Sequence, residues 1–539
     1  MQRTTTGAGR SAVVEPGAAT VGSYVAAFSP APPWDELVRW PPDAFAVANL
    51  LLDHTEAYRF AIAPPPGRRW PSHPGWTEDV RVEGRAWRMA AGAPDPEVPD
   101  AVRRVWDVLT QGRDVPLADL RSGRAWDLCH AILTLHAMAD EAAAGLSAPG
   151  LAPRAFELEA LERLRSHGSL ARLSAARVRI TPKTHFAIRG ITIRSFSRYL
   201  SLAYESVDLR WHRPEPPPWD SAGPGRRAFN LVLVPWPFRL RASDFRPVDG
   251  PLDNMDRRAF GFFEFAPAEA LPAAELDAVV RSALSHVDAI DAVVLPEAAL
   301  DAHEVEVVEA ALRPHPVGGL VSGVRAPAGP SGLGENRLHL AQRHRDGWRR
   351  LDQAKHHRWC LDGDQIRQYH LCRSLDPDRQ WWEAIDLPER RVQLLDVGSG
   401  ATLAPLICED LARLDEVADV LRRIGPTLVV ALLLDGPQLA TRWPARYATI
   451  LADEPGSAVL TLTSLGMAAR CQPPGAHRSR VVALWSGADH RREELSLPSG
   501  ASALLLTAAV GVKTAWTADG RRHDNLPDLE LTAVEPLRA

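Results

Sequence analysis

The second half of the chain alternates short apolar runs with segments of helical periodicity. The apolar runs are 230–235, 292–297, 319–323 and 403–408. The segments of helical periodicity between them include 272–286 and 305–312. A short apolar run between turn residues is typical of a strand buried in a sheet. Residues 336–343 and 348–353 predict a hairpin, because Asp346-Gly347 between them favours a tight turn. Strands that alternate with helices at this spacing predict an α/β domain.

The first half predicts a mostly α-helical, partly irregular domain. Residues 20–95 contain many prolines, as in Trp40-Pro41-Pro42, and proline interrupts regular elements. We therefore expect short helices and turns there, packed through aromatic side chains. Helical periodicity follows from Asp100, which is expected to cap a helix, and again at 125–144 and 156–164.

The length and the turn-rich segments predict how the chain divides. A chain of 539 residues is too long for one ordinary core, so two domains are expected. The proline-rich stretch 213–227 predicts a linker, and residues 1–20 predict a disordered tail. The domains would then span 21–212 and 228–539.

Composition excludes several classes of protein. The formal net charge of −5 is modest, which argues against a chain built wholly around nucleic acid or an anionic membrane. We find no apolar run long enough for a spanning helix or a signal peptide. Five scattered cysteines without a Cys-x-x-Cys unit fit a reducing cytoplasm and give no zinc motif. His136 and Asp140 share a predicted helix face, but two ligands without a third are commonly ordinary side chains. We expect a cytoplasmic protein with no membrane contact, cofactor or metal.

One segment is strongly basic. Residues 171–200 contain no acid and carry interleaved aromatics, and their cations are Arg172, Arg177, Arg179, Lys183, Arg189, Arg194 and Arg198. Charge with aromatic stacking is typical of a nucleic-acid surface. A solvated strand pair or a face that docks within the protein explains the same pattern, and we favour that interpretation.

Three residues at predicted element ends are candidates for chemistry. Cys408 follows the apolar run 403–407, Glu297 ends another apolar run, and Lys355 follows the predicted hairpin. Functional groups in α/β sheets sit where strands end. Each residue alone has an ordinary explanation, because free cysteines are commonly buried as small apolar side chains and acids and lysines are commonly solvated.

The order of these residues resembles the carbon-nitrogen hydrolase, or nitrilase, superfamily over about residues 228–510. Val293-Val294-Leu295-Pro296-Glu297 is similar to the family's strand ending in Pro-Glu, and Leu406-Ile407-Cys408-Glu409-Asp410 to its nucleophile motif. Asn336 to Lys355 is similar to its Asn, turn and Lys segment. The resemblance implies an α-β-β-α sandwich and a homo-oligomer.

The resemblance also implies a reaction, the cysteine-dependent hydrolysis of a non-peptide C–N bond in a small amide or nitrile. Glu297 would take the thiol proton and Cys408 would attack the carbon. Lys355 and the backbone N–H of Glu409 would hold the oxyanion. A thioester would form with loss of ammonia or an amine, and water would then hydrolyse it. An amidase is favoured over a nitrilase because amide substrates predominate in the family.

The family often carries a second acid that orients the lysine. The candidates here are Asp362, Asp364 and Glu383, and Glu383 is best placed to be buried because it follows two tryptophans. Loops at 434–438 and 442–443 are expected to shape the substrate pocket.

Two other functions fit parts of the sequence. In one, a regulatory or defence-type protein uses the basic N-terminal segment to engage nucleic acid or a partner, with the hydrolase domain as effector or scaffold. In the other, Gly398-Ser399-Gly400 is the glycine-rich loop of a methyltransferase that binds S-adenosylmethionine, which should end a strand and open a helix. We interpret it instead as a turn leading into the Cys408 strand.

Overall fold

The computed structural model divides into two compact units. The first comprises residues 1–208, 422–425 and 513–526, and the second comprises 209–421, 426–512 and 527–539. The described residues are 19–28, 33–93, 96–146, 155–174, 178–186, 190–203, 207–212, 228–249, 256–327, 329, 332–345, 347–398, 401–471 and 479–539. The predicted linker and nearly all of the predicted tail lie outside them.

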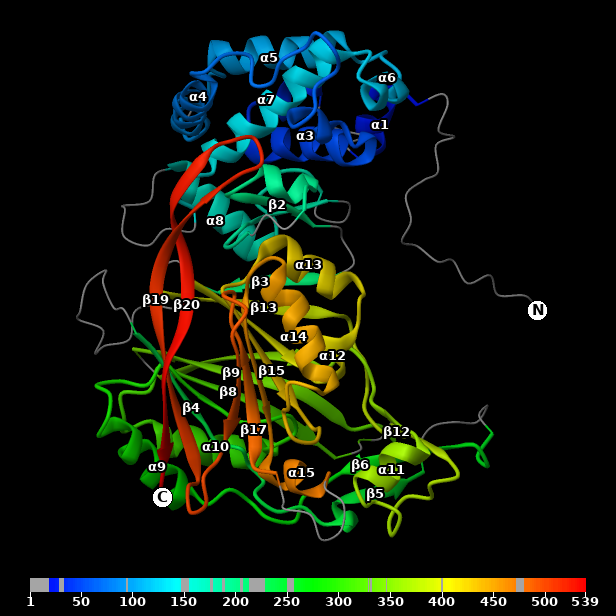
Figure 1. The fold of residues 1–539 in the computed structure, drawn as a ribbon, viewed down its shortest axis with the longest axis vertical. Coiled ribbons are helices and arrows are strands. Elements are labelled where there is room, and N and C mark those ends of the chain that lie inside the picture. Colours follow the sequence, from blue (N-terminus) through cyan, green and yellow to red (C-terminus); the bar gives the residue numbers. More distant parts are fainter. Residues whose placement is uncertain are drawn as a thin grey trace. The chain divides into compact units, whose positions relative to one another are not determined.

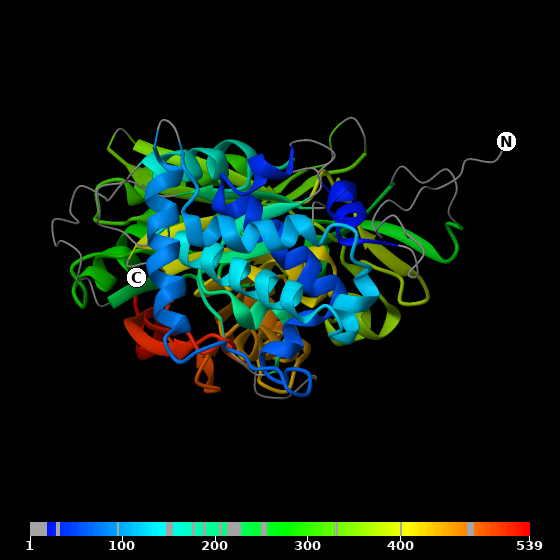
Figure 2. The same ribbon diagram turned by 90° about the horizontal axis from the view of Figure 1, so that it is seen from above.

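The first unit is built mainly from helices (Figures 1 and 2). Its α-helices are α1 (Val21–Phe28), α2 (Trp34–Leu37), α3 (Pro41–Thr55), α4 (Trp76–Ala91), α5 (Asp100–Gln111), α6 (Leu117–Ser122), α7 (Trp126–Ala142) and α8 (Ala155–His167). The unit also holds two 3-10 helices, η1 (Ala57–Ala61) and η2 (Ile193–Phe196), and an antiparallel pair, β1 (Arg179–Pro182) with β2 (Leu200–Ala203). Helix α7 is buried along its length and packs against α3, α4 and α5.

The expectation of only short helices and turns over 20–95 is wrong. Helices α3 and α4 there contain 15 and 16 residues. Pro41 and Pro42 occupy the first turn of α3, where a missing N–H costs nothing and the fixed φ suits the helix. Asp100 is also not a cap, because Pro99 takes that position and Asp100 is the first residue of α5. The boundaries of these helices depend on where each proline lies within the element, not on how many prolines the segment contains.

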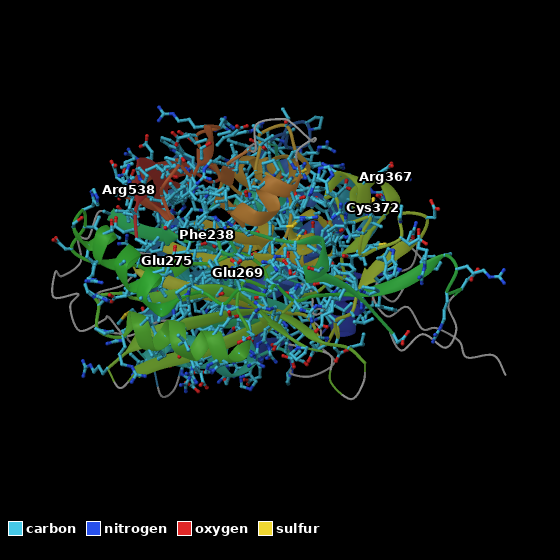
Figure 3. The ribbon with its side chains drawn as sticks, turned by 90° about the horizontal axis from the view of Figure 1, so that it is seen from below. Phe238, Glu269, Glu275, Arg367, Cys372 and Arg538 are labelled. Carbon is cyan, nitrogen blue, oxygen red and sulfur yellow. The ribbon has the colours of Figure 1, made fainter. Side chains whose placement is uncertain are left out.

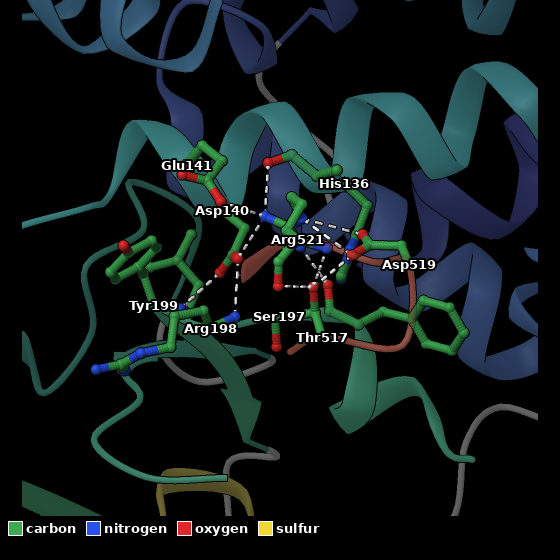
Figure 4. A network of polar contacts seen from close by, with 12 residues as sticks. His136, Asp140, Glu141, Ser197, Arg198, Tyr199, Thr517, Asp519 and Arg521 are labelled. Carbon is green, nitrogen blue, oxygen red and sulfur yellow. Dashed lines mark hydrogen bonds and ion pairs between the residues drawn. The ribbon is translucent and has the colours of Figure 1, made fainter. Parts of the chain in front are cut away.

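A buried cluster of charges surrounds Arg521 in the first unit (Figure 4). Arg521 Nη1 donates to Asp140 Oδ2 and Glu141 Oε1, each at 2.9 Å, and its Nε donates to Asp519 at 3.1 Å. Asp140 also accepts backbone N–H groups of 198–200 at 2.8–2.9 Å. Charge pairing and backbone bonds together satisfy this fully buried carboxylate.

The acid of the predicted His136 and Asp140 pair therefore has a structural role. His136 instead lies 3.2 Å from the side-chain oxygen of Asn49. Among the described residues, no group of three or more His, Cys, Asp or Glu side chains could hold a metal ion. In the same part of the chain, no helix is long and apolar enough to cross a membrane.

Much of the basic segment points into the first unit. Lys183 and Arg198 are buried. Arg172 pairs with Glu159 at 2.8 Å, while Arg177 and Arg189 lie outside the described residues. The buried side chains are engaged inside the unit, as an internal docking face would require.

The second unit contains two seven-stranded sheets. The first has the order β10-β9-β8-β7-β4-β19-β20, with strands β4 (Ala228–Leu233), β7 (Ala292–Val294), β8 (Gly319–Ala326), β9 (Glu335–His344), β10 (Gly347–Ala354), β19 (Ala503–Trp516) and β20 (Arg522–Leu537). The second has the order β18-β17-β16-β15-β14-β13-β3, with strands β3 (Asp208–His212), β13 (Arg391–Gly398), β14 (Ala401–Ile407), β15 (Leu428–Leu433), β16 (Ala458–Thr463), β17 (Val481–Ser486) and β18 (Arg492–Ser496).

Helices and a smaller sheet complete this unit. The helices, one of which continues into the first unit, are α9 (Ala273–Leu284), α10 (Ala302–Leu312), α11 (Gly363–Gln368), α12 (Glu409–Ala412), α13 (Glu416–Ile424), α14 (Trp443–Asp453), α15 (Leu465–Arg470) and η3 (Ala242–Asp244). The small sheet has the order β11-β12-β6-β5, with β5 (Phe245–Val248), β6 (Phe260–Phe265), β11 (Cys360–Leu361) and β12 (Gln380–Glu383). The two large sheets touch where Gln353 of β10 accepts the Gln393 N–H at 2.9 Å and donates to the Pro405 carbonyl at 3.2 Å. The predicted mixture of strands and helices is confirmed.

The hairpin formed by β13 and β14 contradicts the methyltransferase alternative. Gly398 pairs with Ala401 as the two strands run antiparallel, and Ser399 and Gly400 between them lie outside the described residues. A cofactor loop of that kind should open a helix after the strand. Here the second strand leads instead to Cys408.

Candidate active site

Glu297 lies just beyond the end of β7, where the chain leaves the sheet. The residue is buried, with 1 % of its surface exposed. The next residue, Ala298, has a φ of 51°, so the chain turns sharply here. Strand β8 passes very near, because a Cβ on Gly323 would lie 2.3 Å from the Ala298 nitrogen and 2.4 Å from the Glu297 Cα. Glycine at this position is what permits the close approach.

Lys355 follows β10 and donates hydrogen bonds to two carboxylates. Its Nζ lies 2.7 Å from Glu297 Oε1 and 2.6 Å from Glu383 Oε2. All three side chains are buried. An ammonium has three donors, so one N–H of Lys355 remains after these two bonds.

The side-chain amide of Asn336 joins the same two carboxylates. Its Nδ2 donates to Glu297 Oε1 at 2.8 Å and to Glu383 Oε1 at 2.6 Å. Glu383 Oε2 accepts a further bond from the Trp359 N–H at 3.1 Å. Glu297 Oε2, by contrast, is buried and has no hydrogen-bond partner among the described residues. One oxygen of Glu297 thus holds the lysine, and the other can accept a proton.

The other two acids considered for this position lie elsewhere. Asp362 caps α11 by accepting the Gln365 N–H at 2.8 Å. Asp364 has a fully exposed side chain. Of the three candidates in the segment between the lysine and the cysteine, Glu383 is the one that contacts Lys355.

Cys408 connects the end of β14 to the start of α12 in an unusual backbone conformation. Its φ of 42° and ψ of −103° lie where residues other than glycine are seldom found. Its N–H donates to the Leu432 carbonyl of the neighbouring strand at 2.8 Å. Glu409, as the first residue of α12, has an N–H without an intrahelical acceptor, while its side chain pairs with Arg413.

The site electrostatics favour a neutral thiol beside a charged lysine. Burial raises the pKa of Cys408 well above its usual value, and the charge of Glu297 raises it further against the opposing effect of Lys355. Burial alone would lower the pKa of Lys355, but the charges of Glu297 and Glu383 outweigh it and hold that pKa well above its usual value. Burial also raises the pKa of Glu297. A carboxylate with a raised pKa is a better acceptor for a thiol proton.

Asp410, two residues after the cysteine, anchors the segment that follows Lys355. Its Oδ1 lies 2.9 Å from His357 Nδ1, and the other ring nitrogen of His357 lies 2.8 Å from Asp415. Although burial works against it, these two carboxylates raise the pKa of His357 to about 9. His357 is therefore a cation at neutral pH and holds the two acids together.

Residues at the end of β15 form another side of the thiol's surroundings. The backbone of Leu434 lowers the pKa of the Cys408 thiol, and the charge of Asp435 raises it. Asp435 Oδ1 accepts from Arg442 Nη2 at 2.7 Å and from the Tyr369 hydroxyl. The loops expected to shape the pocket thus include side chains close enough to influence the sulfur.

The structure brings the predicted Glu297, Lys355 and Glu383 into contact, and sequence reasoning missed several of their partners. Asn336 belonged to a recognised segment, but nothing in the sequence showed that its amide joins two acids. Asp435 follows an apolar strand, as Glu297 and Cys408 do, and this position was the available signal. Tyr369 is 66 residues from Asp435 in the sequence and Arg442 only seven, but in neither case does the sequence itself show the contact.

The similarity of this chain to known proteins is weak. No family model and no curated protein matches the sequence. Among solved structures, Nit3 from Saccharomyces cerevisiae, a member of branch 10 of the nitrilase superfamily, gives a TM-score of 0.33 with 12% identity, covering 52% of this chain and 90% of that chain. A CN-hydrolase superfamily protein from Xanthomonas campestris with an arsenic adduct in its active site gives a TM-score of 0.28 with 13% identity, covering 58% and 91%. Both of these neighbours are described as nitrilase-superfamily, or CN-hydrolase, proteins.

Proposed function

We propose that the second unit is a cysteine-dependent hydrolase of a non-peptide C–N bond. The observation that carries this proposal is the division of labour on Glu297. Its Oε1 binds Lys355 and Asn336, while its buried Oε2 has no partner among the described residues. Glu297 is held in place and keeps one oxygen free, and its charge acts on the thiol of Cys408. Such a carboxylate suits a general base.

The reaction would use each group at its observed position. Glu297 Oε2 takes the thiol proton as the Cys408 sulfur bonds to the substrate carbon, and the carbonyl oxygen becomes an oxyanion. The third N–H of Lys355 and the backbone N–H of Glu409 would donate to that oxyanion. The protonated Glu297 returns its proton to the leaving nitrogen as the C–N bond breaks, which leaves a thioester.

Water completes the cycle in the second half-reaction. Glu297 takes a proton from water, the resulting hydroxide bonds to the thioester carbon, and the C–S bond breaks. Glu297 then returns the proton to the sulfur, so the products are a carboxylic acid and ammonia or an amine. Glu383 is a positioning residue, because it orients Lys355 and does not touch the substrate in this scheme.

Other expectations belong to the same proposal. Amide substrates are favoured over nitriles by the family resemblance, which also supports an α-β-β-α sandwich of the two large sheets and a homo-oligomer. A cytoplasmic location is supported by the five free cysteines, since free thiols persist in a reducing compartment.

Ammonia release from a panel of primary amides tests the proposal. Cys408→Ala should abolish release while the far-ultraviolet circular dichroism and the unfolding midpoint stay close to those of the unmodified protein. Cys372, which is exposed and labelled in Figure 3, supplies the control, because Cys372→Ala should retain full activity. Ammonia release by the Cys408→Ala protein at the original rate would overturn the proposal.

A further inference from the structure

Near the Cys408 thiol, Asp435 has a buried carboxylate oxygen that lacks a hydrogen-bond partner, as Glu297 does. The residue is 2 % exposed, and its Oδ2 has no hydrogen-bond partner among the described residues. A buried carboxylate oxygen left unpaired is costly, so it is retained where something else binds it. Glu297 Oε2 has the same property and is accounted for by the proposed reaction, whereas Asp435 Oδ2 is not.

The fold places Asp435 at the same sheet edge as the nucleophile. Strands β14 and β15 run parallel with Ile407 opposite Leu432, so their carboxyl ends meet. Cys408 follows the first strand and Leu434-Asp435 follows the second. The Leu434 backbone and the Asp435 charge both act on the pKa of the thiol, in keeping with this shared sheet edge.

The rest of the Asp435 side chain is fixed firmly. Its Oδ1 accepts from Arg442 at 2.7 Å and from the Tyr369 hydroxyl. Thr463 donates its hydroxyl to the Asp435 carbonyl at 2.5 Å. Burial and the Asp435 charge raise the pKa of Tyr369 well above its usual value, so Tyr369 stays a phenol and a donor. The bonds to Oδ1 fix the orientation of the carboxylate, while Oδ2 itself makes no hydrogen bond with the described residues.

The charges around the thiol determine what this oxygen would accept. Glu297, Glu383 and Asp435 contribute three carboxylates against the cations of Lys355 and Arg442, and both cations already bind those carboxylates. A substrate carboxylate would therefore meet an excess of negative charge. A group with N–H hydrogens would meet an unpaired acceptor.

We propose that Asp435 Oδ2 binds an N–H group of the substrate and makes the site select amides that present such a donor over nitriles and over amides that carry a carboxylate. The N–H belongs either to the scissile amide or to an ammonium beside it. The inference rests on the proposed hydrolase function and assigns a specificity-determining residue to it. A site built to bind a donor discriminates strongly against the analogue that lacks it, because its own acceptor is then left unpaired.

Four-carbon probes separate these possibilities: butanamide, 4-aminobutanamide, butanenitrile and succinamate. Asp435→Asn replaces the acceptor with an amide of the same shape. We expect kcat/KM to fall about ten- to hundredfold for all three amides if the scissile N–H is bound, since succinamate carries that N–H as well, or for 4-aminobutanamide alone if an ammonium is bound. Butanenitrile, followed as a substrate or as a competitive inhibitor, should change less than threefold. An equal change for all probes would overturn the inference.

Two controls keep the result interpretable. Tyr369→Phe removes a donor to Oδ1 and leaves Oδ2 unchanged, so its effect should be the same for every probe. The unmodified enzyme provides a test that needs no folded variant, because it should prefer butanamide or 4-aminobutanamide to succinamate by at least tenfold, and a preference for succinamate would refute the inference. If the unmodified protein hydrolyses none of the probes in a Cys408-dependent way, the hydrolase proposal itself is refuted. Failure of that proposal is thereby distinguished from failure of the role given to Asp435.

Discussion

Asp410 accepts the backbone N–H of His356 with both of its carboxylate oxygens, each at 3.1 Å. Asp410 lies two residues beyond Cys408, and His356 directly follows Lys355. The contact therefore ties the turn that carries the proposed nucleophile to the segment that carries the proposed oxyanion donor. It gives a physical reason for an acid at this place in the nucleophile motif.

Asp410→Asn should lower kcat more than it raises KM. The asparagine has one oxygen where the aspartate has two, so the lysine segment loses part of its anchor and the reacting groups lose alignment. We expect a ten- to hundredfold loss in kcat with less than a threefold change in KM, measured with the best amide of the panel. Asp364→Asn, at a fully exposed side chain, should leave both constants unchanged. Equal effects of the two substitutions would contradict a positioning role.

Asn336→Ala should shift the pH dependence of the reaction. The Asn336 amide lowers the pKa of Glu297 by donating to its carboxylate, so its removal leaves that pKa higher still. Because Glu297 must be ionised to take the thiol proton, the acidic limb of the kcat/KM profile should move to higher pH. A profile measured from pH 4 to 9 checks this shift, and an unmoved limb would mean that Asn336 acts only on packing.

Gly323→Ala should damage the site through sterics alone. The added methyl group would lie 2.3 Å from the Ala298 nitrogen, so either the β8 strand or the Glu297 turn must move. Overpacking of this kind costs about 1–3 kcal/mol of unfolding free energy. Gly329→Ala is the matched control, because a Cβ there meets only the Leu333 carbonyl oxygen at 3.9 Å. Urea denaturation of the two variants should separate them clearly.

His357 should make stability depend on pH above neutrality. Its pKa is raised to about 9 from 6.5 by Asp410 and Asp415, so its contribution is fully present below pH 6.5 and is lost as the pH rises through 9. Because the side chain is half-buried, solvent screening reduces the contribution to about 1–2 kcal/mol. His357→Gln should therefore be less stable than the unmodified protein at pH 6.5 and nearly equal to it at pH 10. A constant difference across this range, measured by chemical denaturation, would exclude the ion pairs as its source.

Arg521→Met should destabilise the first unit strongly. The substitution leaves the buried Asp140 without its cation, and breaking a buried pair from one side costs about 3–5 kcal/mol. The control is Arg522→Met, a substitution at the exposed arginine next to Arg521. It should change the unfolding midpoint by less than about 1 °C. Calorimetry on the full chain tests this, and similar midpoints for the two variants would show that the pair adds no net stability.

The strands and helices of the second unit could be predicted from the spacing of their apolar residues. That spacing differs between a helix buried on one face and a strand buried on both. The residues at strand ends followed from the same reasoning, since Glu297 and Cys408 each end an apolar run. The two tryptophans before Glu383 favoured it over Asp362 and Asp364, but its contact with Lys355 required the path of β12, which depends on its pairing with β6. The contact between Arg521 and Asp140 spans 381 residues and leaves no local signal. Residues 20–95 were misjudged because prolines that start a helix have the same composition as prolines that break one.

The segment 513–526, which brings Arg521 into the first unit, decides how this protein can be dissected. A fragment ending near residue 212 contains Asp140 but not its guanidinium partner, so such a fragment would have to bury an isolated charge. A shortened protein that removes the loop between β19 and β20 would create the same defect. The first unit is thus discontinuous in the gene, and the shortest expressible form of it must carry residues from both ends of the chain.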